Sequence, residues 1–301
     1  MIEGERRGVY PGLKKTAAGE RVMKKYIVHI AFIAAILIGV SVLLYPRVSK
    51  YINSLSQSQM VAQYFDEVAG MDGENKRAIL EEAREYNKKL LEKTFRFEFT
   101  DEETAQYKNQ LNTGRGVMGV IDIDKINVKL PIYHGTDDSV LQVGIGHLPG
   151  SSLPVGGVGT HAIITGHRGV PSSKLLSDLD KVEEGDIFLL YILGETLTYQ
   201  VDQIKTVTPD EVRALDIDSN EDYCTLVTCT PYGINTHRLL VRGRRIENAP
   251  GTARWEEIYS GAEWQNKIIT ILIFMAPVTL GLTIYVIIQS RKIRKGGRIH
   301  P

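Results

Sequence analysis

The chain has 301 residues, 43% of them hydrophobic, and its 36 basic and 36 acidic side chains give a formal net charge of zero. This length is enough for one good-sized globular domain with additional segments. The charge balance gives no reason to expect a nucleic-acid partner, because nucleic-acid-binding proteins usually carry a basic excess.

Two long apolar stretches lie near the ends of the chain. Residues 26–46 and residues 268–290 contain no Asp, Glu, Lys or Arg. At about 1.5 Å per helical residue, each is long enough to cross the roughly 30 Å hydrocarbon core of a bilayer. The first stretch has the alternative of a cleaved signal peptide, but it runs long and ends in Leu-Leu-Tyr-Pro, without the small residues that suit cleavage. The sequence therefore predicts two transmembrane helices, of which the first is an uncleaved anchor.

Basic residues flank both stretches on their outer sides. They are concentrated in the tail 1–25, before the first stretch, and in the tail 291–301, after the second. Because basic residues next to membrane spans mark the cytoplasmic side, both tails are expected in the cytoplasm. The region between the spans is then expected outside the cell, tethered to the membrane at both ends.

Residues 47–112 are polar and carry apolar positions at helical spacing. The apolar positions of one such helix are Ile79, Leu80, Ala83, Tyr86, Leu90 and Leu91. Asp72-Gly73 is typical of a break between two helices. Because an apolar stripe at helical spacing is usually buried, this segment is predicted to be a spacer or a support packed against the main domain.

Between residues 113 and 248 the chain consists of short β-rich runs separated by Gly, Pro and Asp. The predicted strands cover residues 117–123, 128–133, 162–165, 187–193, 196–201, 204–207, 225–230 and 237–244. A tight hairpin turn is expected at Gly194-Glu195, and one or two helical turns over residues 173–179. Many short strands with few helices favour a closed β-barrel or a β-sandwich. Residues 249–267 are predicted to be a polar connector to the second span.

The chain has two cysteines, Cys224 and Cys229, in a β-branched run typical of one strand. In an exported protein, a pair of cysteines invites a disulfide. At about 3.3 Å per residue, however, their Cα atoms would be roughly 16 Å apart, beyond the ~7 Å limit for a disulfide. The odd offset also sends the two side chains to opposite faces of the strand. Both thiols are therefore predicted to remain free, in different surroundings.

Cys229 lies at the predicted end of its strand. Thr230-Pro231 follows, and because Pro has no N–H to donate to a neighbouring strand, the thiol is expected beside a loop that a substrate can reach. The next predicted strand begins at His237, so that Arg238 is expected alongside Cys229 in an antiparallel pair. A neighbouring guanidinium favours the thiolate form that acts as a nucleophile. The pattern predicts a cysteine nucleophile assisted by Arg238.

A histidine is expected to donate the proton that the leaving amine requires. The extracytoplasmic region offers His134, His147, His161, His167 and His237. Spacing alone does not choose among them, but His167 follows an apolar strand and lies between Gly166 and Gly169, which allow close approach of a ligand. The others are expected to be packed or surface histidines. No Cys-x-x-Cys or His-x-x-Glu-His pattern is present, so no metal or other cofactor is predicted.

The run Thr-Leu-Val-Thr-Cys that ends at Cys229 resembles the Thr-Leu-x-Thr-Cys signature of sortases. Residues 160–169 and 230–244 resemble the class C branch, which polymerises pilins, and the likeness extends from about residue 116 to residue 245. It implies a mainly β fold, an eight-stranded sortase barrel with N-terminal helices, and a triad of His167, Cys229 and Arg238. It also accounts for the second span, since class C enzymes carry a C-terminal membrane helix.

The resemblance implies a cysteine transpeptidase of a Gram-positive cell surface. Cys229 would cleave a Leu-Pro-x-Thr-Gly-like sorting signal of a pilin or surface protein between Thr and Gly, and form a thioacyl intermediate. The amine of a pilin lysine or of a peptidoglycan precursor would then resolve it. His167 would act as general acid and then base, and Arg238 as a planar donor to the substrate carbonyl or oxyanion. The family's substrate-recognition loop would fall within residues 207–223.

One feature departs from the class C pattern. Most class C sortases carry an Asp-Pro-aromatic lid upstream of the barrel that covers the cysteine at rest. Residues 92–117 contain no such triplet, and residues 47–130 contain no Pro. Either the lid has been lost or another segment performs its task.

Two other functions stay open. The first is a hydrolytic cell-surface cysteine protease, in which water takes the place of the acceptor amine. The second is a non-catalytic module that only docks surface proteins, in which Cys229 is an inert core thiol.

Overall fold

The computed structural model describes residues 17–170, 173–249, 281 and 285–286. The chain divides into two compact units, residues 1–49 and residues 50–301. The predicted second span at residues 268–290 and the connector before it lie almost entirely outside the described residues.

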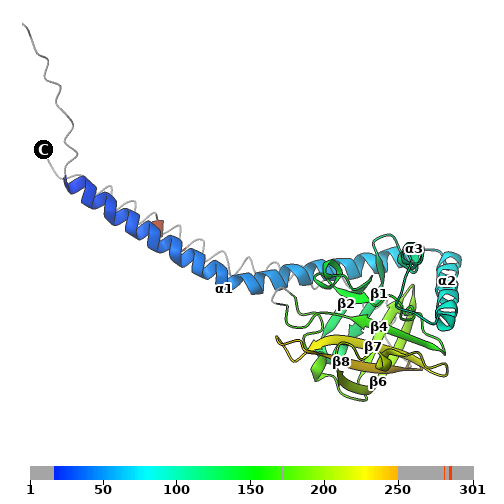
Figure 1. Ribbon diagram of the computed structural model, residues 1–301. Helices are drawn as coiled ribbons and strands as arrows, with labels where there is room; N and C mark the ends of the chain where they lie inside the picture. The colour runs from blue at the N-terminus through cyan, green and yellow to red at the C-terminus, as the bar shows by residue number, and fades with distance from the viewer. Residues whose placement is uncertain (1–16, 171–172, 250–280, 282–284, 287–301) are drawn as a thin grey trace, which may run out of the picture. The chain divides into compact units, whose positions relative to one another are not determined.

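Helix α1 spans Ala17–Gly70 and contains the whole of the predicted first span (Figure 1). Among the described residues, Ile27–Gly70 is the one helix long and apolar enough to cross a membrane. Most of its apolar side chains between residues 27 and 48 are exposed. These properties support a membrane anchor at the N-terminal end of the chain.

Two further helices, α2 (Gly73–Glu92) and α3 (Asp101–Asn109), follow α1. The Asp72 carboxylate accepts hydrogen bonds from the backbone N–H groups of Glu74 and Asn75. This N-cap satisfies donors that the first turn of α2 leaves free, which confirms the predicted break between helices. Helix α3 begins with a reciprocal capping box between Thr100 and Glu103.

The helical segment is a support that shares its core with the barrel. Val61, Tyr64 and Phe65 of α1 belong to the same hydrophobic cluster as the barrel interior. The Tyr64 hydroxyl donates to the carbonyl of Met118 at 3.3 Å and accepts from the N–H of Leu193 at 2.8 Å. Because these side chains fill the core, the barrel depends on the helices for its packing.

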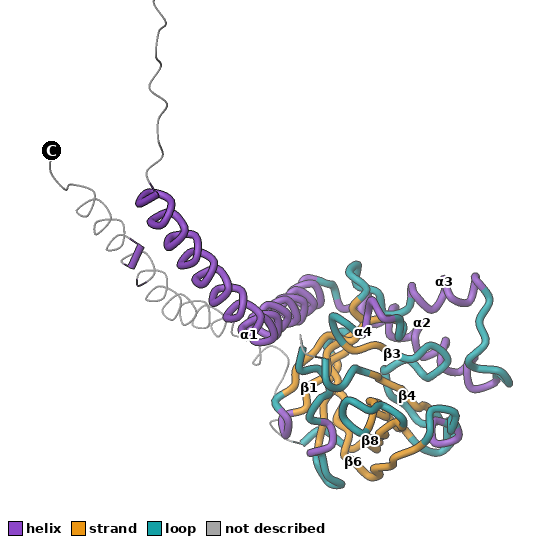
Figure 2. Tube along the Cα trace, turned by 60° about the vertical axis from the view of Figure 1, so that its left-hand side comes forward, coloured by secondary structure: helices purple, strands orange, loops and turns teal. Residues whose placement is uncertain are grey.

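Eight strands close into a barrel in the order β1-β2-β3-β4-β7-β8-β6-β5 (Figure 2). Their bounds are β1 Val117–Ile123, β2 Val128–His134, β3 Ile145–His147, β4 Thr160–Thr165, β5 Ile187–Ile192, β6 Glu195–Val207, β7 Asp222–Thr230 and β8 His237–Ile246. The pairs β2/β3 and β4/β7 are parallel, and the other pairs are antiparallel. The closed barrel, rather than the sandwich, is confirmed; closure leaves no unpaired sheet edge.

The structure differs from the predicted elements in several places. Strand β3 was missed, because a run of three residues is too short to show alternation. Strand β6 is continuous where two strands were predicted, and a register shift between Val201 and Gln203 marks the bulge that disturbs its alternation. The hairpin turn is Leu193-Gly194, with positive φ at both residues, instead of Gly194-Glu195. A 3-10 helix at Leu179–Lys181 replaces the helical turns expected over residues 173–179.

Candidate active site

Cys229 lies on the outer face of the barrel. In β7 the side chains of Cys224 and Leu226 belong to the hydrophobic core. Because side chains alternate along a strand, Cys229 points to the opposite face, together with Thr225 and Val227. Both cysteines are free, Cys224 buried and Cys229 partly buried, which confirms that no disulfide joins them.

The two thiols differ in reactivity. Burial, with a smaller contribution from the charge of Asp222, raises the pKa of Cys224 well above its ordinary value. A buried neutral thiol is inert, since the thiolate is the nucleophile. The accessible thiol at the end of β7 is therefore the candidate nucleophile.

Arg238 is the direct partner of Cys229 in the antiparallel β7–β8 ladder. Directly opposed residues share a face and have Cβ atoms about 4.5–5.5 Å apart. The Arg238 guanidinium donates to the backbone carbonyls of Asn235 at 3.3 Å and of His237 at 3.1 Å. These hydrogen bonds hold the Arg238 side chain at the start of β8, in the strand that pairs with the strand of Cys229.

The parallel β4–β7 pair brings the end of β4, just before His167, beside the strand that carries Cys229. Thr165 is the register partner of Val227, and the N–H of Gly166 donates to the carbonyl of Val227 at 3.1 Å. His167 and Cys229 each lie two residues beyond this pair, His167 after the end of β4 and Cys229 within β7.

Gly166 permits this arrangement through close packing. A Cβ at this position would lie 2.8 Å from a side-chain carbon of Ile145 and 3.0 Å from side-chain carbons of Leu176. The Thr228 hydroxyl also donates to the Gly166 carbonyl at 2.8 Å, which fixes β4 against β7 one residue before His167. The sequence reasoning did not single out Thr228; its place in the Thr-Leu-x-Thr-Cys run was the signal that could have found it.

Two of the remaining histidines are deeply buried and neutral at pH 7. Desolvation lowers the pKa of His147 and of His161 to about 4. His147 Nε2 lies 2.8 Å from the carbonyl of Ser152. His161 Nε2 lies 2.7 Å from the Thr225 hydroxyl, and its Nδ1 lies 2.8 Å from the carbonyl of Asp216. Both rings act as hydrogen-bonded packing groups.

The last two histidines lie at the edges of the fold. Burial also lowers the pKa of His134, whose Nε2 lies 2.6 Å from the carbonyl oxygen of Gln110 and whose Nδ1 lies 3.3 Å from that of Gly116. His237 begins β8, and its Nδ1 lies 2.9 Å from the Thr236 hydroxyl. His134 is thus held by the backbone of the α3–β1 region, whereas His237 stays near the β7–β8 loop.

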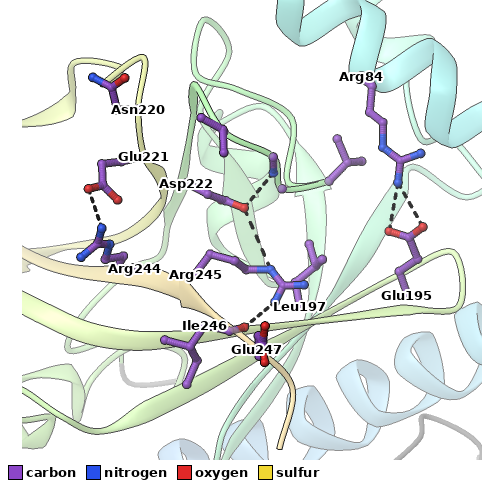
Figure 3. A pocket seen from close by; sticks show the side chains of 14 residues that line it. Arg84, Glu195, Leu197, Asn220, Glu221, Asp222, Arg244, Arg245, Ile246 and Glu247 are labelled. Carbon is purple, nitrogen blue, oxygen red and sulfur yellow. Dashed lines mark hydrogen bonds and ion pairs between the residues drawn. The ribbon is translucent and has the colours of Figure 1, made fainter.

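A pocket of about 580 Å³ opens at the other end of the barrel (Figure 3). Among the residues that line the pocket, Arg84 of α2 donates a hydrogen bond to the carboxylate of Glu195, and Arg244 donates one to the carboxylate of Glu221. The pocket includes Asp222, the first residue of β7, which at about 3.3 Å per residue lies roughly 23 Å from Cys229. It is thus separate from the site around the thiol.

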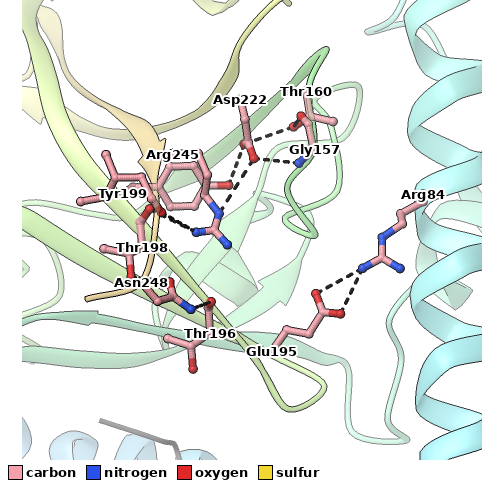
Figure 4. Close-up of polar contacts among 11 residues, drawn as sticks. Arg84, Gly157, Thr160, Glu195, Thr196, Thr198, Tyr199, Asp222, Arg245 and Asn248 are labelled. Carbon is pink, nitrogen blue, oxygen red and sulfur yellow. Dashed lines mark hydrogen bonds and ion pairs between the residues drawn. The ribbon is translucent and has the colours of Figure 1, made fainter. Parts of the chain in front are cut away.

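The buried carboxylate of Asp222 is the centre of this second region (Figure 4). It accepts hydrogen bonds from the Gly157 N–H at 2.7 Å, the Tyr199 hydroxyl at 2.9 Å and the Thr160 hydroxyl at 3.3 Å. Arg245 lies 4.0 Å away. With its charges paired, this network joins the β3–β4 loop to β6, β7 and β8 as a structural junction.

Comparison with known proteins gives a consistent result. The family model "Sortase domain" matches residues 121–246. The crystal structure of sortase C1 from Streptococcus agalactiae is 53% identical, with a TM-score of 0.60, and the match covers 64% of this chain and 100% of that one. Sortase C of Streptococcus pneumoniae is 44% identical, with a TM-score of 0.58 and coverage of 64% and 99%.

More distant relatives match the same region. Sortase C of Clostridium perfringens, solved with the C-terminal cell wall sorting motif, is 42% identical, with a TM-score of 0.57 and coverage of 64% and 100%. Sortase D of Bacillus subtilis is 29% identical over 154 residues, which are 49% of this chain and 74% of that protein.

Proposed function

Because this chain belongs to the sortase family of cysteine transpeptidases, we propose that it is a class C sortase that joins pilin or surface-protein subunits outside the cell, held at the membrane by its two predicted spans. The observation that carries the proposal is the strand register: Cys229 pairs with Arg238, and Thr165, two residues before His167, pairs with Val227, two residues before Cys229. The 53% identity to sortase C1 of Streptococcus agalactiae supports the class.

In the first half-reaction, the Cys229 thiolate attacks the Thr carbonyl carbon of a Leu-Pro-x-Thr-Gly-like signal. Arg238 donates to the oxygen that becomes negative in the tetrahedral intermediate. His167 transfers a proton to the Gly nitrogen as the Thr–Gly bond breaks, which leaves a thioacyl enzyme.

In the second half-reaction, the acceptor of the acyl group is an amine and not water. His167, now neutral, takes a proton from the incoming pilin lysine or peptidoglycan-precursor amine while that nitrogen attacks the thioacyl carbon. The C–S bond breaks, an amide forms, and Cys229 returns to the thiolate. The same three side chains therefore serve both halves of the reaction.

The outer face below the triad is the proposed path of the sorting signal. Thr165 and Val227, which are register partners, precede His167 and Cys229 by two residues on that face. Both are partly exposed. Farther along, His161 Nδ1 bonds to the carbonyl of Asp216 in the β6–β7 loop. This contact holds the loop over the lower part of the face, which agrees with a role for residues 207–223 in substrate recognition.

Transfer to an amine separates this proposal from hydrolysis. We expect the full chain in detergent to convert a Leu-Pro-Glu-Thr-Gly peptide into a lysine adduct when a lysine-containing peptide is added, because the thioacyl carbon is open to a nucleophile from the outer face. Mass spectrometry measures adduct against free acid. Free acid alone at saturating lysine peptide would identify the hydrolytic protease, and no cleavage by folded protein would identify the docking module.

Residues 93–100, between α2 and α3, contain no Asp-Pro-aromatic triplet. Between α2 and α3, the Arg96 guanidinium forms an ion pair with Asp216 at 3.1 Å. The carbonyl of Asp216 bonds to His161, the register partner of Tyr223. Tyr223 precedes Cys229 by six residues, roughly 20 Å along β7. We therefore propose that residues 93–100 leave Cys229 uncovered.

Thiol labelling tests whether the site is open. Releasing the segment with Arg96→Gln is expected to change the rate of Cys229 alkylation in the full chain by less than about twofold, because an uncovered thiol has no opening step before reaction. Arg115→Gln, which breaks the surface pair with Glu67, is the matched control. An increase of tenfold or more in Arg96→Gln alone, about 1.4 kcal/mol of closure, would show that this segment acts as a lid.

A further inference from the structure

A buried arginine lies next to His167 and contacts the segments that carry the proposed triad. The Arg168 side chain is only 8% exposed. Its guanidinium donates to the Thr230 hydroxyl at 3.3 Å and to the carboxylate of Asp180. The guanidinium carbon also lies 5.9 Å from the ring centre of Tyr232. One side chain thus joins the end of β4 to the residue after Cys229 and to the β7–β8 loop.

This guanidinium is costly to bury. Its Nε is buried without a hydrogen-bond partner, so its donors are not all satisfied. Removing a charge from water carries a penalty that one ion pair seldom offsets. Replacing a buried ion pair by well-packed apolar side chains is often neutral or stabilising. The cost points to a role beyond stability.

Together with the hydrogen bonds of Gly166, the contacts of Arg168 hold the backbone on both sides of His167. On one side, Gly166 is bonded to Val227 and Thr228 of β7. On the other side, Arg168 is bonded to Thr230 at the end of the same strand. The residues on both sides of His167 are therefore hydrogen-bonded to the strand that carries Cys229.

The loop after Arg168 is packed closely against the same region. Gly169 has a φ of +80°, and a Cβ there would lie 3.1 Å from the ring of Tyr232. The ring is thus held over the backbone beside Arg168, and it belongs to the loop that leads to Arg238. The close approach links the position of that loop to the position of His167.

We propose that Arg168 is a positioning residue for transpeptidation, which holds His167 and Cys229 at the separation that proton transfer requires. The inference rests on the proposed triad. His167 must reach the leaving nitrogen in one half-reaction and the attacking nitrogen in the other. A displacement of about 1 Å in such a group can cost a hundredfold in rate.

The test compares two substitutions in the full chain. With a fluorogenic Leu-Pro-Glu-Thr-Gly peptide, Arg168→Gln is expected to lower kcat by about 10- to 100-fold while KM changes less than about twofold, because binding surfaces remain and alignment is lost. Arg168→Lys keeps the charge beside Asp180, but an ammonium does not reproduce the fork that also reaches Thr230. We expect it to restore the thermal midpoint and to leave most of the loss in kcat.

Arg84→Gln is the matched control, since it breaks the ion pair with Glu195 on the far side of the barrel and is expected to keep kcat. A wild-type kcat in Arg168→Lys, or a loss in Arg168→Gln that only equals the loss of folded protein, would overturn the inference. If Arg168→Gln does not fold, Thr230→Val removes the bridging hydroxyl alone, and a wild-type kcat there has the same consequence. Activity that survives Cys229→Ala would instead overturn the proposed function.

Discussion

Replacing Cys229 with Ala is expected to lower the rate of acyl transfer by at least about a thousandfold, whereas Cys224→Ala keeps most of the activity. The first change removes the only accessible thiol of the pair, and with it the thioacyl intermediate. The second removes a thiol that burial keeps neutral. Peptide cleavage, lysine-adduct formation and the covalent acyl-enzyme mass together measure the effect.

Stability has to be measured beside activity for this pair. Cys224 is fully buried in the barrel core, so its truncation is expected to cost on the order of 1 kcal/mol in the free energy of unfolding. Cys229 is partly exposed and lies at a strand end, so its truncation costs less. An equal loss of transfer from both variants, with both shown to be folded, contradicts the assignment of Cys229 as the nucleophile.

The local pattern around β7 and β8 was enough to predict one half of the site. Cys229 and Arg238 are close in sequence and joined by one short connection, so their pairing follows from the turn and the strand lengths. The odd offset between Cys224 and Cys229 also predicted their opposite faces correctly. These inferences depend only on strand geometry, which local sequence determines well.

The other half of the site depends on long-range pairing. His167 follows β4, which pairs in parallel with β7, a contact between segments some sixty residues apart. Alternation within β4 does not reveal which strand it pairs with, so spacing left all the histidines open. For this reason the choice of His167 rested on its glycines and on the family resemblance. Arg168 was missed because only the folded chain brings Thr230 and Asp180 to its side chain.

The helical segment shows a different limit of sequence reasoning. Its apolar stripe predicted burial, and Leu80, Ala83 and Leu90 are buried, whereas Leu91 is exposed. The spacing of the apolar residues did not show which surface covers these side chains, so both a spacer and a support stayed possible. The shared core with Tyr64 and Phe65 resolves the question in favour of a support. Removing these helices is therefore unsuitable for testing a lid, since it would also open the core.

Replacing His167 with Ala is expected to lower transpeptidation by about a hundredfold or more, whereas His161→Ala retains activity per folded molecule. Loss of the imidazole at residue 167 removes the proton donor for the leaving amine. Loss of the imidazole at residue 161 removes hydrogen bonds to Thr225 and Asp216, which lowers stability by about 1–3 kcal/mol. Transfer rates normalised to folded protein measure the contrast.

The pH dependence of stability distinguishes the packing role of His161 from a catalytic one. Desolvation lowers the pKa of the folded-state imidazole from 6.5 to about 4, so the unfolded chain binds more protons between those values. Stability therefore falls as pH decreases from about 6.5 to about 4. His161→Ala is expected to make this fall shallower, while His147, which has the same depressed pKa, preserves the remainder. An unchanged slope in His161→Ala would contradict the lowered pKa of this imidazole, and a loss of transfer as large as that of His167→Ala in folded protein would contradict a packing role for His161.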